Sequence, residues 1–195
     1  MKKLLALALI ALVIWNAYRI PGGSAYFHPT SDESQRYSVK LTAGTHLSVE
    51  GGATVRNENA VDIDGNEYQK LVINFDGIPG MENQTSYSRL SKEGIFTRTS
   101  TKVRIPEYME LPLPPEVGRK WRYEVNGHTA ESEIIAIESV ATPDRVYHQC
   151  IKVHSRGTLN GRQADSITYY APRAGKVKTT LTFSDATVEM TLRNK

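Results

Sequence analysis

The sequence contains a single cysteine, Cys150, so the chain cannot form a disulfide bond within itself. In an oxidising compartment the thiol is then either buried or bridged to another chain. At 195 residues the chain is long enough to bury a sizeable core. We therefore expect one domain that its core alone holds together.

The sequence also lacks the motifs of the common catalytic and cofactor sites. It has no His-Glu-x-x-His zinc motif, no phosphate-binding loop, no dinucleotide fingerprint and no Gly-x-Ser-x-Gly elbow. Asp165-Ser166 is better interpreted as the start of a strand than as part of a triad. The alternating acids Glu131, Glu133 and Glu138 are typical of a solvated strand face. We predict no catalytic residue, no cofactor and no enzymatic activity.

A calcium loop is the first metal site to consider, because Asp62, Asp64 and Glu67 lie close together. Such a loop needs glycine at its sixth position and glutamate at its twelfth. Here Gly65 follows Asp64 directly, and Ile73 occupies the twelfth position. We predict a hairpin turn at Asp64-Gly65.

A second metal candidate is the set His148, Cys150 and His154, which would project from one face of a strand. Imidazole and thiolate ligands suit copper or zinc. On an extended strand, however, about 20 Å separates the two histidines, at about 3.3 Å per residue. They cannot share an ion, so we predict no metal site.

The main part of the chain has no excess of charge of either sign. Lys2, Lys3 and Arg19 are the basic residues of the first 25, which contain no acid. Since the whole chain has 24 basic and 21 acidic residues, residues 26–195 carry as many bases as acids. Nucleic-acid binding requires clustered positive charge. We therefore expect no nucleic-acid partner.

What the N-terminus does contain is a basic start followed by an apolar run from Leu4 to Trp15. This order is typical of a secretory signal, with cleavage after Ala25. Residues 4–20 are alternatively long enough to remain as an anchor in a thin membrane. A lipid-modified N-terminus needs a cysteine just after the run, and the only cysteine is Cys150, so this form of anchor is excluded. Residues 1–25 are thus a signal peptide or a membrane anchor, and both deliver the remainder across a membrane.

After a polar tether over residues 26–35, short alternating runs separated by glycine-containing turns continue to residue 195. The turn dipeptides, which supply the positive φ angles of tight hairpins, are Asp64-Gly65, Asp76-Gly77, Asn126-Gly127 and Asn160-Gly161. Strand-forming residues are concentrated in 71–75, 121–125, 151–153 and 177–183. Residues 131–140 have the length of a short helix, but their three isoleucines favour a strand. We predict a single antiparallel β-domain over residues 36–195.

A weak internal repeat divides this domain. Residues 68–75 align with 147–154, and residues 91–96 align with 172–177. The halves would be residues 36–103 and 116–195. Between them, residues 104–118 hold four prolines, which lack ladder donors and so mark a connector or an edge segment.

Two segments carry a resemblance to a known group of proteins. They are the proline-rich lead-in Leu111–Gly118 before Trp121-Arg-Tyr123, and the turn region Ile167–Lys178. The chain resembles a broad group of bacterial envelope proteins and lipoproteins over residues 103–183. Such proteins are similar to the strongly curved antiparallel sheet of the lipoprotein carriers. This chain lacks the carriers' amphipathic helices and the group's usual lipid-bearing cysteine.

The alternating runs predict an all-β fold, and the repeat predicts two similar halves. With the strong curvature that the resemblance implies, we expect a strongly curved antiparallel meander, a half-barrel or open barrel, after an N-terminal hydrophobic helix. Trp121, Tyr123, Tyr169 and Tyr170 would line a ligand groove or pair across strands in the core. We expect a periplasmic protein, or one anchored in the inner membrane through residues 4–20 with its domain outside the cytoplasm. The leading interpretation of its function is a non-catalytic accessory or scaffold subunit with a protein partner in the envelope. The alternative is a binder or carrier of a hydrophobic or lipid ligand, and a deep apolar pocket would favour this alternative.

Overall fold

The structure, a computed structural model, describes residues 23–27, 34–44, 47–78, 81, 83–125 and 127–193. These residues form an antiparallel sheet of 13 strands and a single 3-10 turn, η1 (Gly23–Tyr26). The predicted all-β antiparallel class is confirmed. Within the described ranges no helix is long and apolar enough to span a membrane. The predicted hydrophobic helix, the membrane segment 4–20 and most of the tether lie outside these residues.

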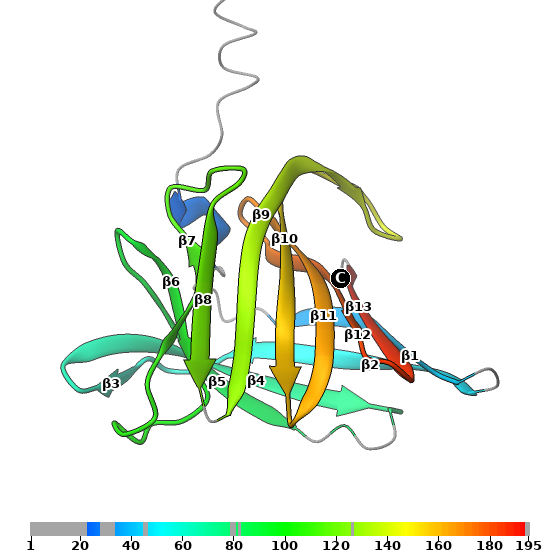
Figure 1. Ribbon diagram of the computed structural model, residues 1–195, viewed down its shortest axis with the longest axis horizontal. Helices are drawn as coiled ribbons and strands as arrows, with labels where there is room; N and C mark the ends of the chain where they lie inside the picture. The colour runs from blue at the N-terminus through cyan, green and yellow to red at the C-terminus, as the bar shows by residue number, and fades with distance from the viewer. Residues whose placement is uncertain are drawn as a thin grey trace, which may run out of the picture.

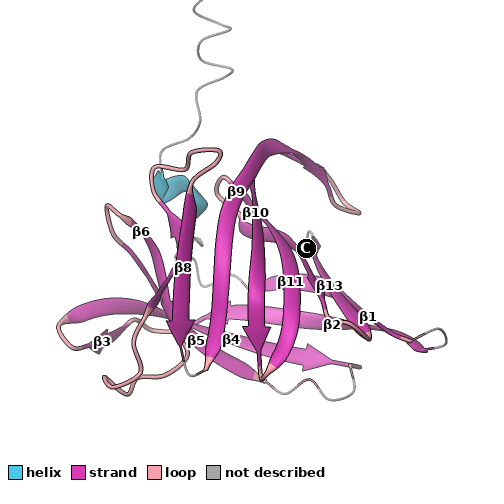
Figure 2. Ribbon diagram, in the orientation of Figure 1, coloured by secondary structure: helices cyan, strands magenta, loops and turns pink. Residues whose placement is uncertain are grey.

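The strands follow one another with short connections (Figures 1 and 2). In chain order they are β1 (Gln35–Ala43), β2 (Leu47–Asn57), β3 (Val61–Ile63), β4 (Asn66–Asp76), β5 (Gln84–Leu90), β6 (Gly94–Arg98), β7 (Tyr108–Pro112), β8 (Lys120–Val125), β9 (His128–Ala141), β10 (Val146–Leu159), β11 (Arg162–Ala171), β12 (Gly175–Thr182) and β13 (Ala186–Arg193).

The sheet consists of two meanders joined side by side. Its strand order is β7-β6-β5-β4-β2-β1-β13-β12-β11-β10-β9-β8, and β3 pairs with β4 beside this path. The first meander therefore runs from β1 to β7 and the second from β8 to β13. Strands β1 and β13 join them, because Arg36–Ala43 pairs with Ala186–Arg193 along its whole length. The first and last strands of the sheet domain are thus neighbours.

The segments of the predicted repeat occupy matching places in the two meanders. Residues 68–75 lie in β4 and residues 147–154 in β10, each the third strand along the main path of its meander. Residues 91–96 and 172–177 both span the turn between the fourth and fifth strands.

Two predicted hairpin turns have the backbone that their sequences require. Asp64 and Gly65 have φ angles of 56° and 74° between paired Ile63 and Asn66. Asn160 and Gly161 have φ angles of 52° and 74° between paired β10 and β11. Positive φ at both central residues is the geometry of a type I′ turn, which follows the twist of the flanking strands.

The free edges of the sheet, β7 and β8, approach one another and nearly close it into a barrel (Figure 1). Side chains make this contact. The rings of Tyr108 and Tyr123 stack with their centroids 4.6 Å apart. The indole N–H of Trp121 donates a hydrogen bond to the Met109 carbonyl oxygen at 3.0 Å. The prediction that the proline-rich stretch contains an edge segment is confirmed, since β7 is the outermost strand of its meander.

The core has two clusters of buried residues. The smaller surrounds Tyr26, Leu111, Ile134 and Ile151. The larger includes residues of β1 and β13 as well as Val140 and Tyr147 from the β9–β10 hairpin. This hairpin bends at its end and reaches over β12 and β13 (Figure 1), where Asp144 pairs with Arg193 at 3.8 Å.

Candidate functional site: a cavity inside the sheet

The interior of the barrel-like sheet is not filled. A cavity of about 320 Å³ lies between the two meanders, at the lower end of the size range of ligand pockets. Its apolar wall includes residues of β2, β4, β6 and β13 and the ring of Phe27 beside η1. These are Val55, Leu71, Ile73, Ile95, Met190 and Phe27.

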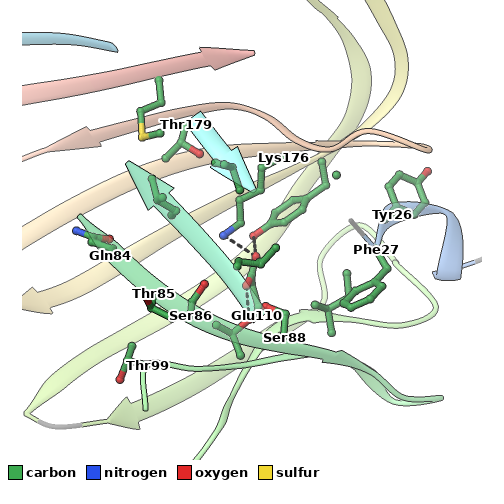
Figure 3. Close-up of a pocket in the computed structure, with 18 of the residues that line it drawn as sticks. Tyr26, Phe27, Gln84, Thr85, Ser86, Ser88, Thr99, Glu110, Lys176 and Thr179 are labelled. Atoms are coloured by element: carbon green, nitrogen blue, oxygen red, sulfur yellow. Dashed lines mark hydrogen bonds and ion pairs between the residues drawn. The ribbon is translucent and has the colours of Figure 1, made fainter. Parts of the chain in front are cut away.

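A carboxylate–ammonium pair lies inside this cavity. Glu110 of β7 and Lys176 of β12 point toward one another (Figure 3), with Lys176 Nζ 2.7 Å from Glu110 Oε1. The Glu110 side chain is 12% exposed, whereas that of Lys176 is 49% exposed. The pair therefore connects the two meanders from within, and its cationic member also reaches solvent.

Two hydroxyl groups complete the surroundings of the Glu110 carboxylate. The Thr97 hydroxyl donates to Oε2 at 2.5 Å, and the Tyr170 hydroxyl donates to Oε1 at 3.1 Å. Burial raises the pKa of Glu110, but Lys176 and these hydrogen bonds outweigh burial and bring the pKa below its usual range. Burial, followed by the Glu110 charge, raises the pKa of Tyr170 well above its ordinary value. At neutral pH the site therefore holds a charged Glu110 and a protonated Tyr170.

One side of the cavity carries further hydroxyl groups. Ser88 and Thr97 share a hydrogen bond of 3.0 Å between β5 and β6. Ser86 and Thr99 also line this side (Figure 3). The cavity thus combines apolar walls with a few polar groups, a composition that suits a small amphipathic ligand.

The η1 turn and the residue after it bound another side (Figure 3). Tyr26 is 1% exposed, and its hydroxyl donates to the Gln149 carbonyl oxygen at 3.1 Å. The Arg173 backbone N–H donates to the Ala25 carbonyl oxygen at 2.6 Å. Burial raises the pKa of Tyr26 to about 12. These bonds attach η1 to β10 and to the β11–β12 turn.

The aromatic residues singled out in the sequence divide between both expected roles. Tyr170 lines the cavity, and Tyr123 stacks on a cavity residue, Tyr108. Tyr169 is partly buried, with Lys152 Nζ 5.4 Å from its ring centroid. Trp121 is partly buried on β8 and packs against the smaller core cluster.

No sequence motif pointed to Glu110 or Lys176. Glu110 lies in a proline-rich stretch between Met109 and Leu111, and Lys176 follows a turn glycine. The alternation of polar and apolar residues suggests only that both side chains belong to the solvated face of a strand. Glu110 and Lys176 come together only because the sheet closes, and the closure depends on strands that are far apart in the sequence.

The prediction that His148 shares a strand face with Cys150 and His154 is wrong. The pairing register shifts between Tyr147 and Cys150, and Gln149 has a φ of 57°, so strict alternation stops at this bulge. Cys150 is fully buried with a free thiol, and burial raises its pKa to about 11. His148 is exposed and hydrogen-bonds to Ser139 at 2.9 Å.

His154 and the acidic candidates Asp165 and Asp62 take part in interactions at the surface. His154 lies 2.9 Å from Asp165, which also accepts a bond from Arg156 at 2.9 Å. Asp62 accepts a bond from the Gly65 backbone N–H at 3.2 Å, so it stabilises the hairpin turn.

Each of the three alternating acids of β9 is in an ion pair with a neighbouring strand. Glu131 pairs with Arg122, and Glu133 pairs with Lys120. Glu138 pairs with Lys152. Among the described residues, no group of three histidine, cysteine or acidic side chains is arranged to hold a metal ion.

The fold is similar to two solved structures. One is a Bacteroides fragilis protein, inferred to be exported, with a YmcC-like fold: TM-score 0.55, 14% identity, covering 87% of this chain and 100% of that chain. The other is a Parabacteroides distasonis protein, inferred to be a lipoprotein: TM-score 0.52, 12% identity, covering 86% of this chain and 97% of that chain. At these identities the likeness shows the fold. The predicted resemblance to lipoprotein carriers is not confirmed.

No protein-family model matches the sequence, and no curated protein matches it.

Proposed function

We propose that this chain is an extracytoplasmic protein of the bacterial envelope whose sheet binds a small, mainly apolar ligand in its interior. The observation that carries this proposal is the cavity of about 320 Å³ between the two meanders. A filled interior would have favoured the leading prediction from the sequence, a scaffold subunit. An unfilled, largely apolar interior favours the alternative, a binder or carrier.

The proposed cellular location rests on two observations. The N-terminal sequence combines a basic start with an apolar run, as secretory signals and anchors do. One structural neighbour is described as an exported protein and the other as a lipoprotein. These observations support a location beyond the inner membrane.

The polar groups of the cavity suggest how a ligand would be oriented. Lys176 has three N–H donors, and its bond to Glu110 uses one of them. Its remaining donors suit a carbonyl, hydroxyl or acidic group at one end of the ligand. The apolar part would then contact Val55, Ile73 and Met190. The proposed role is binding without chemical conversion.

The test is the affinity of the full chain, in an uncharged detergent, for an apolar fluorescent naphthylamine probe. Ile73→Trp fills part of the cavity and should weaken binding at least tenfold. The matched control is Val72→Trp, because Val72 is the next residue of β4 and does not line the cavity. Mass spectrometry of the purified protein should identify an apolar molecule that the wild type retains and Ile73→Trp loses.

Two results would contradict the proposal. One is equal probe binding by Ile73→Trp and the wild type when both have the same melting temperature. The other is an equal loss of binding in Ile73→Trp and Val72→Trp, which would place the probe outside the cavity.

A further inference from the structure

A second concave region lies on the surface, and Ala25 of η1 is among the residues that line it. It has a volume of about 480 Å³ and shares no lining residue with the cavity. The β9–β10 hairpin, the β11–β12 turn and η1 form its wall. We call it the basic hollow, and its lining residues are Ala25, Arg145, Val146, Tyr147, His148, Gln149, Pro172, Arg173 and Ala174.

The charge of the basic hollow is of one sign. Arg145 and Arg173 are both exposed, and neither guanidinium forms an ion pair within the described part of the chain. His148 adds an exposed imidazole. No aspartate or glutamate is among the described residues that line the hollow. Residues 26–195 as a whole have no net charge. The excess of positive charge is therefore local to the basic hollow.

The backbone around the hollow is also unusual. Outside glycine, the described residues with positive φ are Asp64, Gln149, Asn160 and Arg173. Asp64 and Asn160 belong to two-residue hairpin turns, in which these residue types are common. Gln149, at 57°, and Arg173, at 64°, are not residues that favour this conformation, and both line the basic hollow. Such conformations are concentrated at binding sites.

Contact with an aromatic ring holds the Arg145 side chain, and a hydrogen bond holds the Arg173 backbone. The guanidinium carbon of Arg145 lies 4.3 Å from the centroid of the Tyr147 ring, and Tyr147 is 7% exposed. The Arg173 backbone is attached to Ala25 by the hydrogen bond described above. The cations therefore project from anchored positions, which reduces the entropy lost on binding an anion.

We propose that the basic hollow binds the phosphate group of a larger ligand. Guanidinium groups match phosphate in charge and in paired N–H donors. A volume of about 480 Å³ leaves room for a further group beside the phosphate. Because the hollow is on the surface and has exposed polar side chains, that group would be polar, such as a glycerol or a sugar. A phospholipid headgroup and a soluble phosphorylated compound share this chemistry.

Calorimetric titration of the full chain in uncharged maltoside micelles tests this site. One arm uses sn-glycerol 1-phosphate, and the other uses a short-chain phosphatidylglycerol. Arg173→Gly removes the cation while glycine readily adopts the positive φ, so the fold should be preserved. Arg145→Gln is a second, independent variant. Arg122→Gln is the matched control, since Arg122 is an exposed arginine of β8 outside the hollow.

Each hollow variant should weaken binding by roughly tenfold or more, as expected for the loss of a charge-assisted bond, and Arg122→Gln should leave it unchanged. Glycerol phosphate binding at least as tight as that of phosphatidylglycerol identifies a soluble ligand, and tighter binding of phosphatidylglycerol identifies a lipid headgroup. The proposal is overturned if the wild type binds neither compound at millimolar concentration. It is equally overturned if Arg122→Gln weakens binding as much as the hollow variants.

Discussion

Glu110 shows how one buried side chain links the closure of the sheet to its stability. Its carboxylate receives bonds from Lys176 of β12, Tyr170 of β11 and Thr97 of β6. An acid this buried is unfavourable unless its partners are complete. The site is therefore stable only when β7 has closed against the second meander.

We predict that Glu110→Gln lowers the free energy of unfolding by about 1–3 kcal/mol at pH 7, because charge-assisted hydrogen bonds are lost. The folded-state pKa of Glu110 lies below its unfolded value. Its contribution is therefore present above about pH 4.3, the ordinary pKa of glutamate, and is lost as the pH falls through the lower folded pKa. Urea denaturation of both proteins at several pH values measures this. A difference that stayed constant from pH 7 to pH 2 would show that the Glu110 charge is not involved.

At the scale of elements, the turns and strands were the most predictable part of the fold. Asp64-Gly65 and Asn160-Gly161 have the φ angles expected from their sequences, because turn geometry depends on adjacent residues. The three isoleucines of residues 131–140 correctly favoured a strand over a helix, and β9 includes them all. The bulge at Gln149 was not predicted, since glutamine has no strong preference for positive φ.

The candidate site was less predictable, because it depends on contacts between residues far apart in the sequence. Tyr170 was a candidate for a ligand groove, whereas Glu110 and Lys176 were not. Charged residues on strands usually face solvent, and only the pairing of distant strands reverses this. The edge of the sheet at β7 was foreseen from its prolines, but its contact with β8 depends on side chains of both meanders.

The contact between β7 and β8 supplies the second prediction. Trp121→Ala should lower the free energy of unfolding by about 3 kcal/mol, because a large, partly buried ring is removed. Trp121→Phe keeps an aromatic ring but loses the hydrogen bond to the Met109 carbonyl oxygen, so the loss should be about 1 kcal/mol. Chemical denaturation of both variants measures these values. No loss of stability in either variant would mean that Trp121 does not hold the two edges together.

At the scale of the whole molecule, the pairing of β1 with β13 constrains when the protein can fold. The first strand of the domain completes its hydrogen bonds only when the last strand is available. Contacts over such long sequence separations form slowly. The complete sheet can therefore form only after β13 has been made.

The final prediction concerns the direction in which the chain crosses the membrane. Lys2 and Lys3 precede the apolar run, whereas the 20 residues after Ile20 have two basic residues and two acids. This asymmetry should keep the N-terminus in the cytoplasm and carry residues 26–195 across.

A reporter that is active only outside the cytoplasm should thus be active when it is fused after Lys195. Changing Leu9 and Leu12 to arginine should abolish this activity, since each central arginine costs about 2.5–3.5 kcal/mol on insertion. Isoleucines at Leu9 and Leu12 are the control, because they keep the run apolar, and they should preserve export. Activity of a cytoplasmic reporter alone would refute the envelope location, and with it the proposed ligand-binding role there.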